Sequence, residues 1–198
     1  ERGYSEQIAT QAQLSSLQAR IRPHFLFNSL NMAAELVYHN AEDAEKTILA
    51  LADLSRAAMH CDEAIPLEKE VLLAQQYMLV ESWRFGDRLT IDWQLPDHSP
   101  ELKVPALTIQ PLLENAICHG VEPNEAASTV SIQLLVSSSS ISFIIDNPYL
   151  QQASKSRPSN GIAVENIKER LTMYFGKRAK LTHFIQDENY RTKLVIPR

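Results

Sequence analysis

Hydrophobic residues recur with helical spacing through the first half of the chain, and their stripe changes side at Pro23. Before the proline the seam consists of Leu14, Leu17 and Ile21, with the spacing of a coiled coil. After it, the apolar stripe lies on nearly the opposite side and consists of Leu26, Leu30, Ala33 and Val37. The old side continues as a polar stripe of His24, Asn28, Asn31 and Glu35. Because proline kinks helices, we predict one long helix whose packing face switches at His24.

Two more helices are predicted before residue 86. Asn40, with Asp43 three residues later, favours a helix from about Ala41 to Met59. After a short connection over residues 60–65, Pro66 suits the first position of a third helix, which runs to about residue 85 and ends at Gly86. The residues expected to face the core are Ile48, Leu51, Leu54 and Ala58 in the second helix and Leu67, Val71, Ala74 and Met78 in the third.

From Arg88 onward the pattern mixes strands with helices. Alternation of apolar and polar residues predicts strands over 89–95, 129–136 and 140–145, and a closing hairpin from 180–185 and 192–196. Helices are predicted over 105–119 and 162–175, with Val164, Ile167 and Leu171 of the second facing inward, and residues 147–160 are expected to form a loop. The fold class is therefore α+β, with one layer of helices on a mostly antiparallel sheet.

Composition narrows the class of protein. The 198 residues allow one large domain or two small ones, and 44% hydrophobic content suffices for packed cores. The net charge of −5 argues against direct nucleic-acid binding. Two cysteines, Cys61 and Cys118, make no disulfide framework, which favours a reducing cytosol. No apolar run is long enough to span a bilayer, no signal peptide is visible, and we expect a fragment of a longer protein.

His24 is a candidate phosphoacceptor. A neutral imidazole is nucleophilic near physiological pH and can attack a γ-phosphorus without a strong base. Because the packing face of the predicted helix changes at His24, the imidazole of this residue should be accessible. An isolated histidine would more simply be a surface residue, but the surrounding string Pro-His-Phe-Leu-Phe-Asn-Ser-Leu-Asn, residues 23–31, favours a chemical role.

A second candidate site lies in the predicted helix that ends near residue 120. Phosphoryl transfer needs Mg²⁺, which takes only one or two protein oxygens, and the side-chain oxygen of Asn115 meets that need. Glu114 can polarise the attacking nucleophile, and His119, four residues after Asn115, can reach a phosphate from the same face. The alternative is a plain amphipathic helix with Gly120 as its C-cap, which explains the glycine but not the Glu-Asn pair.

Residues 23–31 resemble the phosphoacceptor motif of the LytS/YehU-type sensor histidine kinases. The resemblance extends through Leu67-Glu68-Lys69-Glu70, through Tyr77, Glu81 and residues 84–88, and into the later boxes. It implies that His24 is the phosphoacceptor. It also implies that residues 1–85 form a helical dimerisation and phosphoacceptor region, and that residues 86–198 form a GHKL-type (Bergerat-type) ATP-binding catalytic domain.

The resemblance also assigns the nucleotide site. Residues 110–120 look like the family's N box, with Asn115 as the Mg²⁺ ligand and Cys118 where Lys or Arg is common. By likeness Asp146 accepts a hydrogen bond from the adenine amino group, with Pro148 and Leu150 replacing the glycines that usually follow. Residues 160–171 resemble the glycine box, with Ala163 replacing its second glycine. The expected cofactor-binding residues are Asn115, His119, Gly120, Asp146, Asn147, Gly161, Ile162, Asn166 and Arg170.

The surroundings of His24 differ from those in other histidine-kinase classes at one position and resemble them at another. The acidic neighbour that they carry beside the phosphoacceptor is replaced by Phe25. Asn28, one turn later, resembles the amide or hydroxyl residue with which other kinases remove phosphate from their partner, although it can also simply belong to the polar stripe. His24, Asn28 and Glu114 are therefore the expected catalytic residues.

The resemblance implies the cytoplasmic part of a two-component sensor kinase, anchored in a bacterial inner membrane in its full-length form. It would form a homodimer, use ATP and Mg²⁺, and pass the phosphoryl group to an aspartate of a response regulator of the LytTR type. The altered glycines resemble the subgroup that regulates alginate production and pilus motility. An alternative is a degenerate sensor that acts as a phosphatase or docking module. A GHKL ATPase or protein serine kinase conflicts with the histidine string.

Overall fold

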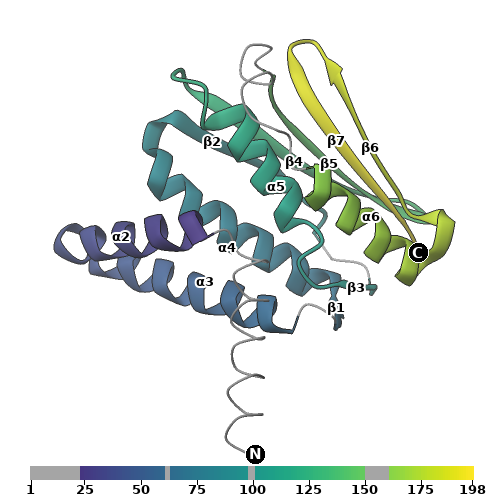
Figure 1. Ribbon diagram of the computed structural model, residues 1–198, viewed down its shortest axis with the longest axis horizontal. Helices are drawn as coiled ribbons and strands as arrows, with labels where there is room; N and C mark the ends of the chain where they lie inside the picture. The colour runs from purple at the N-terminus through teal and green to yellow at the C-terminus, as the bar shows by residue number, and fades with distance from the viewer. Residues whose placement is uncertain (1–22, 61–62, 98–100, 150–160) are drawn as a thin grey trace, which may run out of the picture.

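The computed structural model describes residues 23–60, 63–97, 101–149 and 161–198. The described part of the chain begins with three helices, α2 (Pro23–His39), α3 (Ala41–Met59) and α4 (Leu67–Phe85), and α2 and α3 form an antiparallel hairpin beside α4 (Figure 1). The coiled-coil seam predicted before Pro23 lies outside the described residues. The switch of packing face at the histidine therefore stays a prediction.

The ends of the first helices follow local chemistry. The Asn40 side chain caps α3 by accepting a hydrogen bond from the backbone N–H of Asp43 at 3.2 Å, which confirms the predicted start. Gly86, at a φ of 53°, ends α4 as predicted. The predicted start of α4 was wrong by one residue, because Pro66 is extended and belongs to the short strand β1 (Ala64–Pro66). Strand β1 therefore includes the last two residues of the connection predicted over residues 60–65.

Burial along α2 differs from the prediction. The residues buried in this helix are Phe25, Ser29 and Ala33. Leu30 is 47% exposed and Val37 is 55% exposed, so the predicted apolar stripe meets the core only in part. Ala33 is buried, and Leu26 is partly buried and packs against the core. In α3, Ile48 is also exposed, whereas the other predicted core positions of α3 and α4 are buried. The exposed apolar residues lie on the surface of a single chain because α2 packs on α3 and α4 through its Phe25 side.

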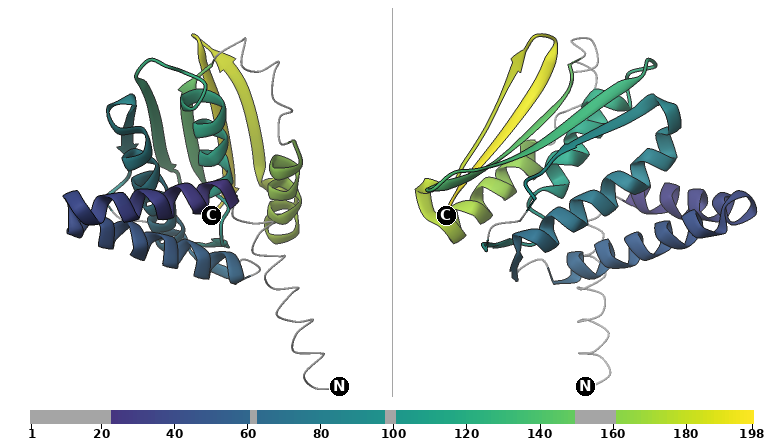
Figure 2. Two further views of the ribbon diagram at one scale, coloured as in Figure 1. Left: turned by 60° about the vertical axis from the view of Figure 1, so that its left-hand side comes forward. Right: turned by 180° about the vertical axis from the view of Figure 1, so that it is seen from behind.

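A five-stranded mixed sheet forms the second half of the molecule. Its strands, in spatial order, are β2 (Leu89–Gln94), β4 (Ser128–Val136), β5 (Ser140–Pro148), β7 (Asn189–Pro197) and β6 (Lys180–Gln186). Only the β2–β4 pair is parallel. The helices α5 (Gln110–Ala116) and α6 (Gly161–Phe175) cover one face of the sheet (Figures 1 and 2). The predicted α+β fold with a mostly antiparallel sheet is therefore confirmed.

The predicted helix over 105–119 begins later than expected. Residues Lys103–Pro105 form the strand β3, which pairs antiparallel with β1. After it, the backbone N–H groups of residues 107, 108 and 109 donate to the carboxylate of Glu70, at 2.9, 2.6 and 2.7 Å. Because that carboxylate takes these donors, the segment remains a turn and α5 starts at Gln110. The short π-helix η2 (Ile117–Val121) continues α5 past Gly120, so the alternative interpretation of this glycine as a plain C-cap is wrong.

Helix α4 joins the two halves of the molecule. Its apolar residues belong to one continuous core that also includes Phe25 of α2 and the inner faces of the strands. Glu70 of α4 binds the turn before α5, and burial raises the pKa of this carboxyl while its three backbone hydrogen bonds act in the opposite direction. The predicted domain boundary at residue 85 stays a prediction. Helix α4 contacts α2 and α3 on one side and α5 and β2 on the other.

Candidate functional site

The first turn of α2 meets α4, α5 and η2 around a pocket of about 250 Å³. Its lining residues come from all four elements and are His24, Phe25, Tyr77, Glu81, Arg84, Glu114, Ile117, Cys118 and Glu122. The fold thus brings the candidate phosphoacceptor His24 to the same pocket as Glu114, which lies ninety residues later in the sequence. Cys118, at the position where the resemblance expects Lys or Arg, lines the pocket as well.

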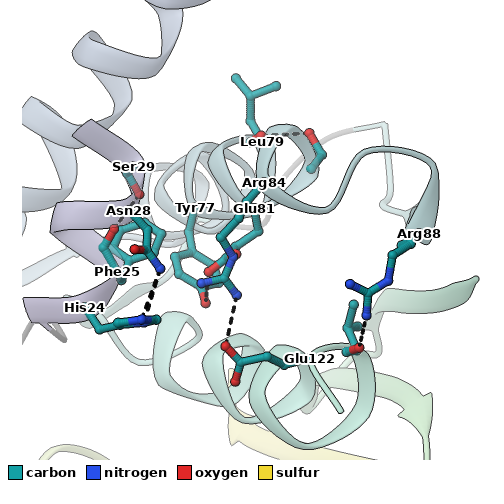
Figure 3. A network of polar contacts seen from close by, with 12 residues as sticks. His24, Phe25, Asn28, Ser29, Tyr77, Leu79, Glu81, Arg84, Arg88 and Glu122 are labelled. Carbon is teal, nitrogen blue, oxygen red and sulfur yellow. Dashed lines mark hydrogen bonds and ion pairs between the residues drawn. The ribbon is translucent and has the colours of Figure 1, made fainter. Parts of the chain in front are cut away.

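His24 and Asn28 interact on the exposed surface of α2. The side-chain amide nitrogen of Asn28 lies 3.2 Å from Nδ1 and 3.4 Å from Nε2 of His24 (Figure 3). An amide nitrogen can only donate, so it binds whichever ring nitrogen carries the lone pair. The predicted proximity of Asn28 to the ring is therefore present, and Asn28 competes with any electrophile for that lone pair.

Phe25 anchors the start of α2 against α4. Its side chain is buried, and its ring centroid lies 5.0 Å from that of Tyr77. The hydroxyl of Ser29 donates to the Phe25 carbonyl oxygen at 2.6 Å, which reinforces the same turn. Because Phe25 points into the core, the neighbouring His24 is directed towards the pocket rim (Figure 3).

A buried carboxylate, Glu81, lies at the back of the pocket. Its Oε1 accepts a hydrogen bond from the Tyr77 hydroxyl at 3.0 Å, and its Oε2 lies 2.9 Å from Nε of Arg84. Arg84 also lies 3.7 Å from Glu122 of the segment after η2 (Figure 3). Burial raises the pKa of Glu81 to about 7, and Arg84 offsets only part of that shift. Burial also raises the pKa of Tyr77.

Sequence reasoning did not select these α4 residues as site residues. It named Tyr77, Glu81 and Arg84 only as part of the family likeness. A usable signal was nevertheless present, because positions 77, 81 and 84 follow four-and-three spacing and share one face of a helix. Polar groups on the buried face of a helix require partners, which is a reason to look for a site there.

The N-box residues divide between the pocket and the interior. Glu114 is buried, accepts a hydrogen bond from the Gln110 side chain at 3.0 Å and lines the pocket. Asn115 and His119 are partly buried on the same helical segment. Gly120 lies against β5, where an added Cβ would come within 2.9 Å of the Asn147 Cβ. Close approach to a strand explains this glycine, rather than the alternative of a helix cap.

Asp146 and Asn147 lie on opposite faces of β5. The strand continues to Pro148, past the predicted end at residue 145, so its side chains keep alternating. Asn147 is 2% exposed on the face covered by the helices, next to Gly120. Asp146 points to the other face and forms a bidentate ion pair with Arg191, its partner in β7, at 2.6 and 2.8 Å. The structure therefore places Asp146 on the face of β5 opposite to the one that the helices cover.

The predicted glycine box opens α6. Gly161 and Ile162 form its first turn, while the side chains of residues 161–164, and with them the effect of Ala163, lie outside what is described. Asn166 is exposed. The guanidinium of Arg170 donates to the carbonyl oxygens of Ala106 and Leu107, which ties α6 to the turn before α5. Leu150 lies outside the described residues.

The residues of the N box are compatible with the expected Mg²⁺, most of whose ligands would come from the nucleotide and water. Within the described ranges, no group of three or more His, Cys, Asp or Glu side chains is arranged to hold a metal. Mg²⁺ on a nucleotide needs only one or two protein oxygens, and Asn115 offers one. The N-terminus of the 15-residue helix α6 offers backbone N–H groups for phosphate.

No helix in the described parts of the chain is both long and apolar enough to span a membrane.

Comparisons with known proteins agree with this geometry. Residues 12–89 match the histidine kinase family. The chain is 31% identical over 181 residues to the sensor histidine kinase YpdA of Escherichia coli, covering 86% of this chain and 32% of the relative. It is 32% identical over 184 residues to the sensor histidine kinase/phosphatase LytS of Staphylococcus aureus, again covering 86% and 32%. The chain thus spans about a third of the length of the curated relatives it matches.

Solved structures show the same fold. The catalytic domain of the histidine kinase ThkA superposes with a TM-score of 0.52 at 12% identity, covering 68% of this chain and 95% of that domain. The histidine kinase domain of a blue-light-activated kinase from Erythrobacter litoralis gives a TM-score of 0.50 at 15% identity, covering 94% and 91%. At these identities the likeness concerns the fold alone. The sequence relatives show that the chain belongs to the LytS-type sensor histidine kinases.

Proposed function

We propose that this chain catalyses ATP-dependent phosphorylation of its own His24 and transfers the phosphoryl group to an aspartate of a response regulator. The observation that carries the proposal is the shared pocket, because it places a nucleophilic imidazole beside Glu114 and Cys118 of the N box. A nucleophile and its phosphoryl donor must lie close together and in line, and such placement accounts for most of the catalysis in phosphoryl transfer.

The residues have distinct roles in this reaction. The ring nitrogen of His24 that carries the lone pair attacks the γ-phosphorus, and Asn28 must release that nitrogen first. Glu114, adjacent to Asn115, polarises the nucleophile, while Asn115 would hold Mg²⁺, which supplies neutralisation of the phosphate oxygens. His119 and the first amides of α6 contact the phosphates. Cys118 stands where the family often carries Lys or Arg, and a cysteine cannot supply their positive charge, so we expect slow turnover.

We also propose that Asn147, rather than Asp146, binds the adenine. Asn147 lies on the helix-covered face next to Gly120, whereas the carboxylate of Asp146 is bound to Arg191 on the opposite face. The amide oxygen of Asn147 can accept a hydrogen bond from the exocyclic amino group of adenine. Its amide nitrogen donates to the Pro148 carbonyl oxygen at 2.9 Å, which directs the amide oxygen away from that contact.

Labelling with γ-phosphate-labelled MgATP tests the kinase activity. We expect a label that is stable to base and labile to acid, as a phosphoramidate bond is, and that disappears in His24→Ala. His39→Ala and His60→Ala are matched controls, because both remove an exposed histidine near the ends of the same helical hairpin. Retention of the label in His24→Ala would show that another residue is the acceptor.

A second activity, removal of phosphate from the regulator, is favoured by Asn28. Its amide lies one turn from His24 and is suited to orient a water molecule towards an aspartyl phosphate. The name of the Staphylococcus aureus relative includes both kinase and phosphatase. We expect Asn28→Ala to slow loss of phosphate from the regulator while His24 can still be labelled. Equal rates of loss with wild type and Asn28→Ala would refute this role.

The remaining features of the signalling system follow from the family. We propose that the chain works as a homodimer in the cytoplasmic part of a membrane-anchored sensor, and that its regulator is of the LytTR type. The exposed apolar residues Leu30, Val37 and Ile48 of the α2–α3 hairpin support dimerisation, because a second copy would cover them. Sedimentation equilibrium tests this directly, and a monomer at micromolar concentration would contradict the homodimer.

A further inference from the structure

We propose that Glu81 accepts the ring proton of His24 as the histidine is phosphorylated. This inference rests on the proposed function and adds a proton acceptor to it. The carboxylate comes from α4, since the residue next to His24 in the sequence is Phe25. None of the three residues on either side of His24 is an Asp or a Glu.

The chemistry of the imidazole creates the need for such a group. Neutral His24 has one ring nitrogen with a lone pair and one with a proton. When the lone pair bonds to the γ-phosphorus, the bond from phosphorus to the bridging oxygen breaks and its electron pair leaves with ADP. The ring would then carry a positive charge, unless the proton on its other nitrogen passes to an acceptor. Transfer to the Glu81 carboxylate gives a neutral phosphorylated ring and a carboxylic acid, which returns its proton to solvent.

The packing of α2 brings the acceptor to the histidine. Phe25 turns inward and rests on the ring of Tyr77, whose hydroxyl donates to Glu81 Oε1. His24 and Glu81 consequently line the same pocket from facing helices (Figure 3). Phe25, at the position that holds an acid in other kinase classes, packs α2 against α4, and α4 supplies the acid as Glu81.

Glu81 has an oxygen available for this task. It is 2% exposed, and Oε1 is oriented by Tyr77. Oε2 lies 2.9 Å from Arg84 Nε, yet within the described part of the chain no donor reaches it with hydrogen-bond geometry. A buried carboxylate oxygen without a hydrogen bond is costly, and an imidazole N–H would satisfy it.

The surrounding charges suit a proton acceptor that works near neutral pH. The groups facing Glu81 are Tyr77 and Arg84 on its own helix, His24 from α2, Glu114 from α5, and Cys118 and Glu122 from η2 and the residue after it. Burial, with smaller contributions from Glu122 and Glu114, raises the pKa of Glu81 to about 7, against the effects of Arg84 and Tyr77. Glu114 adjoins Asn115 and binds Gln110, which suits it to the nucleotide side.

The test compares Glu81→Gln with Glu122→Gln in two phosphorylation assays. Both variants remove one carboxylate from the pocket and from Arg84, but only the first removes the proposed acceptor. With MgATP, we expect Glu81→Gln to slow labelling of His24 by about 100-fold or more, the usual contribution of a general base, and Glu122→Gln by less than about tenfold. Glu81→Asp should recover part of the lost rate. Equal losses in Glu81→Gln and Glu122→Gln would overturn the proposal.

The second assay replaces ATP with phosphoramidate, a small donor that phosphorylates imidazole directly. It separates this inference from the proposed kinase activity. If MgATP fails to label the wild type but phosphoramidate labels His24 more slowly in Glu81→Gln, the role of Glu81 stands and the kinase proposal fails. If phosphoramidate labels folded Glu81→Gln as fast as wild type at every pH, the role of Glu81 is refuted.

Tyr77→Phe provides a second variant that keeps the carboxylate. The Tyr77 hydrogen bond lowers the pKa of Glu81, so its loss should raise that pKa above 7. The rising limb of the rate of His24 phosphorylation against pH should therefore move to higher pH. A purely structural role of Glu81 would change the rate without moving this limb, and an unmoved limb would contradict the proposal.

Discussion

The ring of Phe25 lies 5.0 Å from the ring of Tyr77, tilted by 38°, and this contact joins the helix of the phosphoacceptor to the helix that lines its pocket. The proposed action of Glu81 on His24 depends on this contact, because the Tyr77 hydroxyl orients the Glu81 carboxylate. The aromatic pair therefore couples the packing of α2 to the chemistry of His24. It also explains how a residue that carries no reactive group can matter next to the phosphoacceptor.

Replacing Phe25 with alanine should destabilise the protein and slow phosphorylation together. Removal of a buried phenylalanine typically costs about 3–5 kcal/mol in the free energy of unfolding. The undocked helix would also let His24 leave the pocket. Denaturant unfolding and His24 labelling measure the two effects. Phe27→Ala is the matched control, because Phe27 is 66% exposed and its loss should change stability by less than about 0.5 kcal/mol.

The raised pKa of Glu81 predicts how stability depends on pH. An acid whose pKa rises from 4.5 to about 7 on folding binds its proton more tightly in the folded state. Its contribution to stability is therefore fully present below pH 4.5 and is lost as the pH rises to about 7. The loss is of order 3 kcal/mol at most. Denaturant unfolding at pH 5 to 8 should show a smaller decline for Glu81→Gln than for wild type, and parallel declines would contradict the shift.

The sequence predicted the regular elements well because their signals are local. Asn40 starts α3 with a side-chain cap, and Gly86 ends α4 with its backbone conformation. Both effects depend only on neighbouring residues. The strands showed alternation, and α4 and α6 showed apolar stripes that the fold buries. The start of α5 was mispredicted because its determinant is distant, namely the Glu70 carboxylate that binds three backbone N–H groups nearly forty residues later.

The site was predictable only in its separate parts. Motif likeness singled out His24 and Glu114, but nothing local shows that they line one pocket. The exposure of Leu30 and Val37 was missed because a helix with apolar residues on two sides does not reveal which side its own chain covers. Asp146 was assigned by likeness to the family, which does not show which face of the strand it occupies. Strand β5 continues to Pro148, three residues past the predicted end, and its alternation decides which side chain faces the helices. The likeness to the alginate and pilus-motility subgroup stays a prediction.

Gly120→Ala should destabilise the contact between η2 and β5. The added methyl would lie 2.9 Å from both Cβ and Cγ of Asn147 and closer still to its side-chain amide nitrogen, which forces a shift that typically costs about 1–3 kcal/mol. The double variant Gly120→Ala with Asn147→Ala removes the amide group that the new methyl meets, so part of the loss should be recovered. Thermal and denaturant unfolding of the four members of this cycle measure the coupling. If the losses in the free energy of unfolding are additive, the new methyl does not clash with the Asn147 side chain.

The opposite faces of β5 predict different effects of its two polar residues on nucleotide binding. Asn147→Ala should weaken binding of MgADP by up to about tenfold, the value of one hydrogen bond. Asp146→Ala should leave the affinity unchanged, because the carboxylate binds Arg191 on the far face of the sheet. It should lower stability by no more than about 1 kcal/mol, since this ion pair is partly exposed. Isothermal titration with MgADP distinguishes the two, and a loss of affinity confined to Asp146→Ala would restore Asp146 as the adenine ligand.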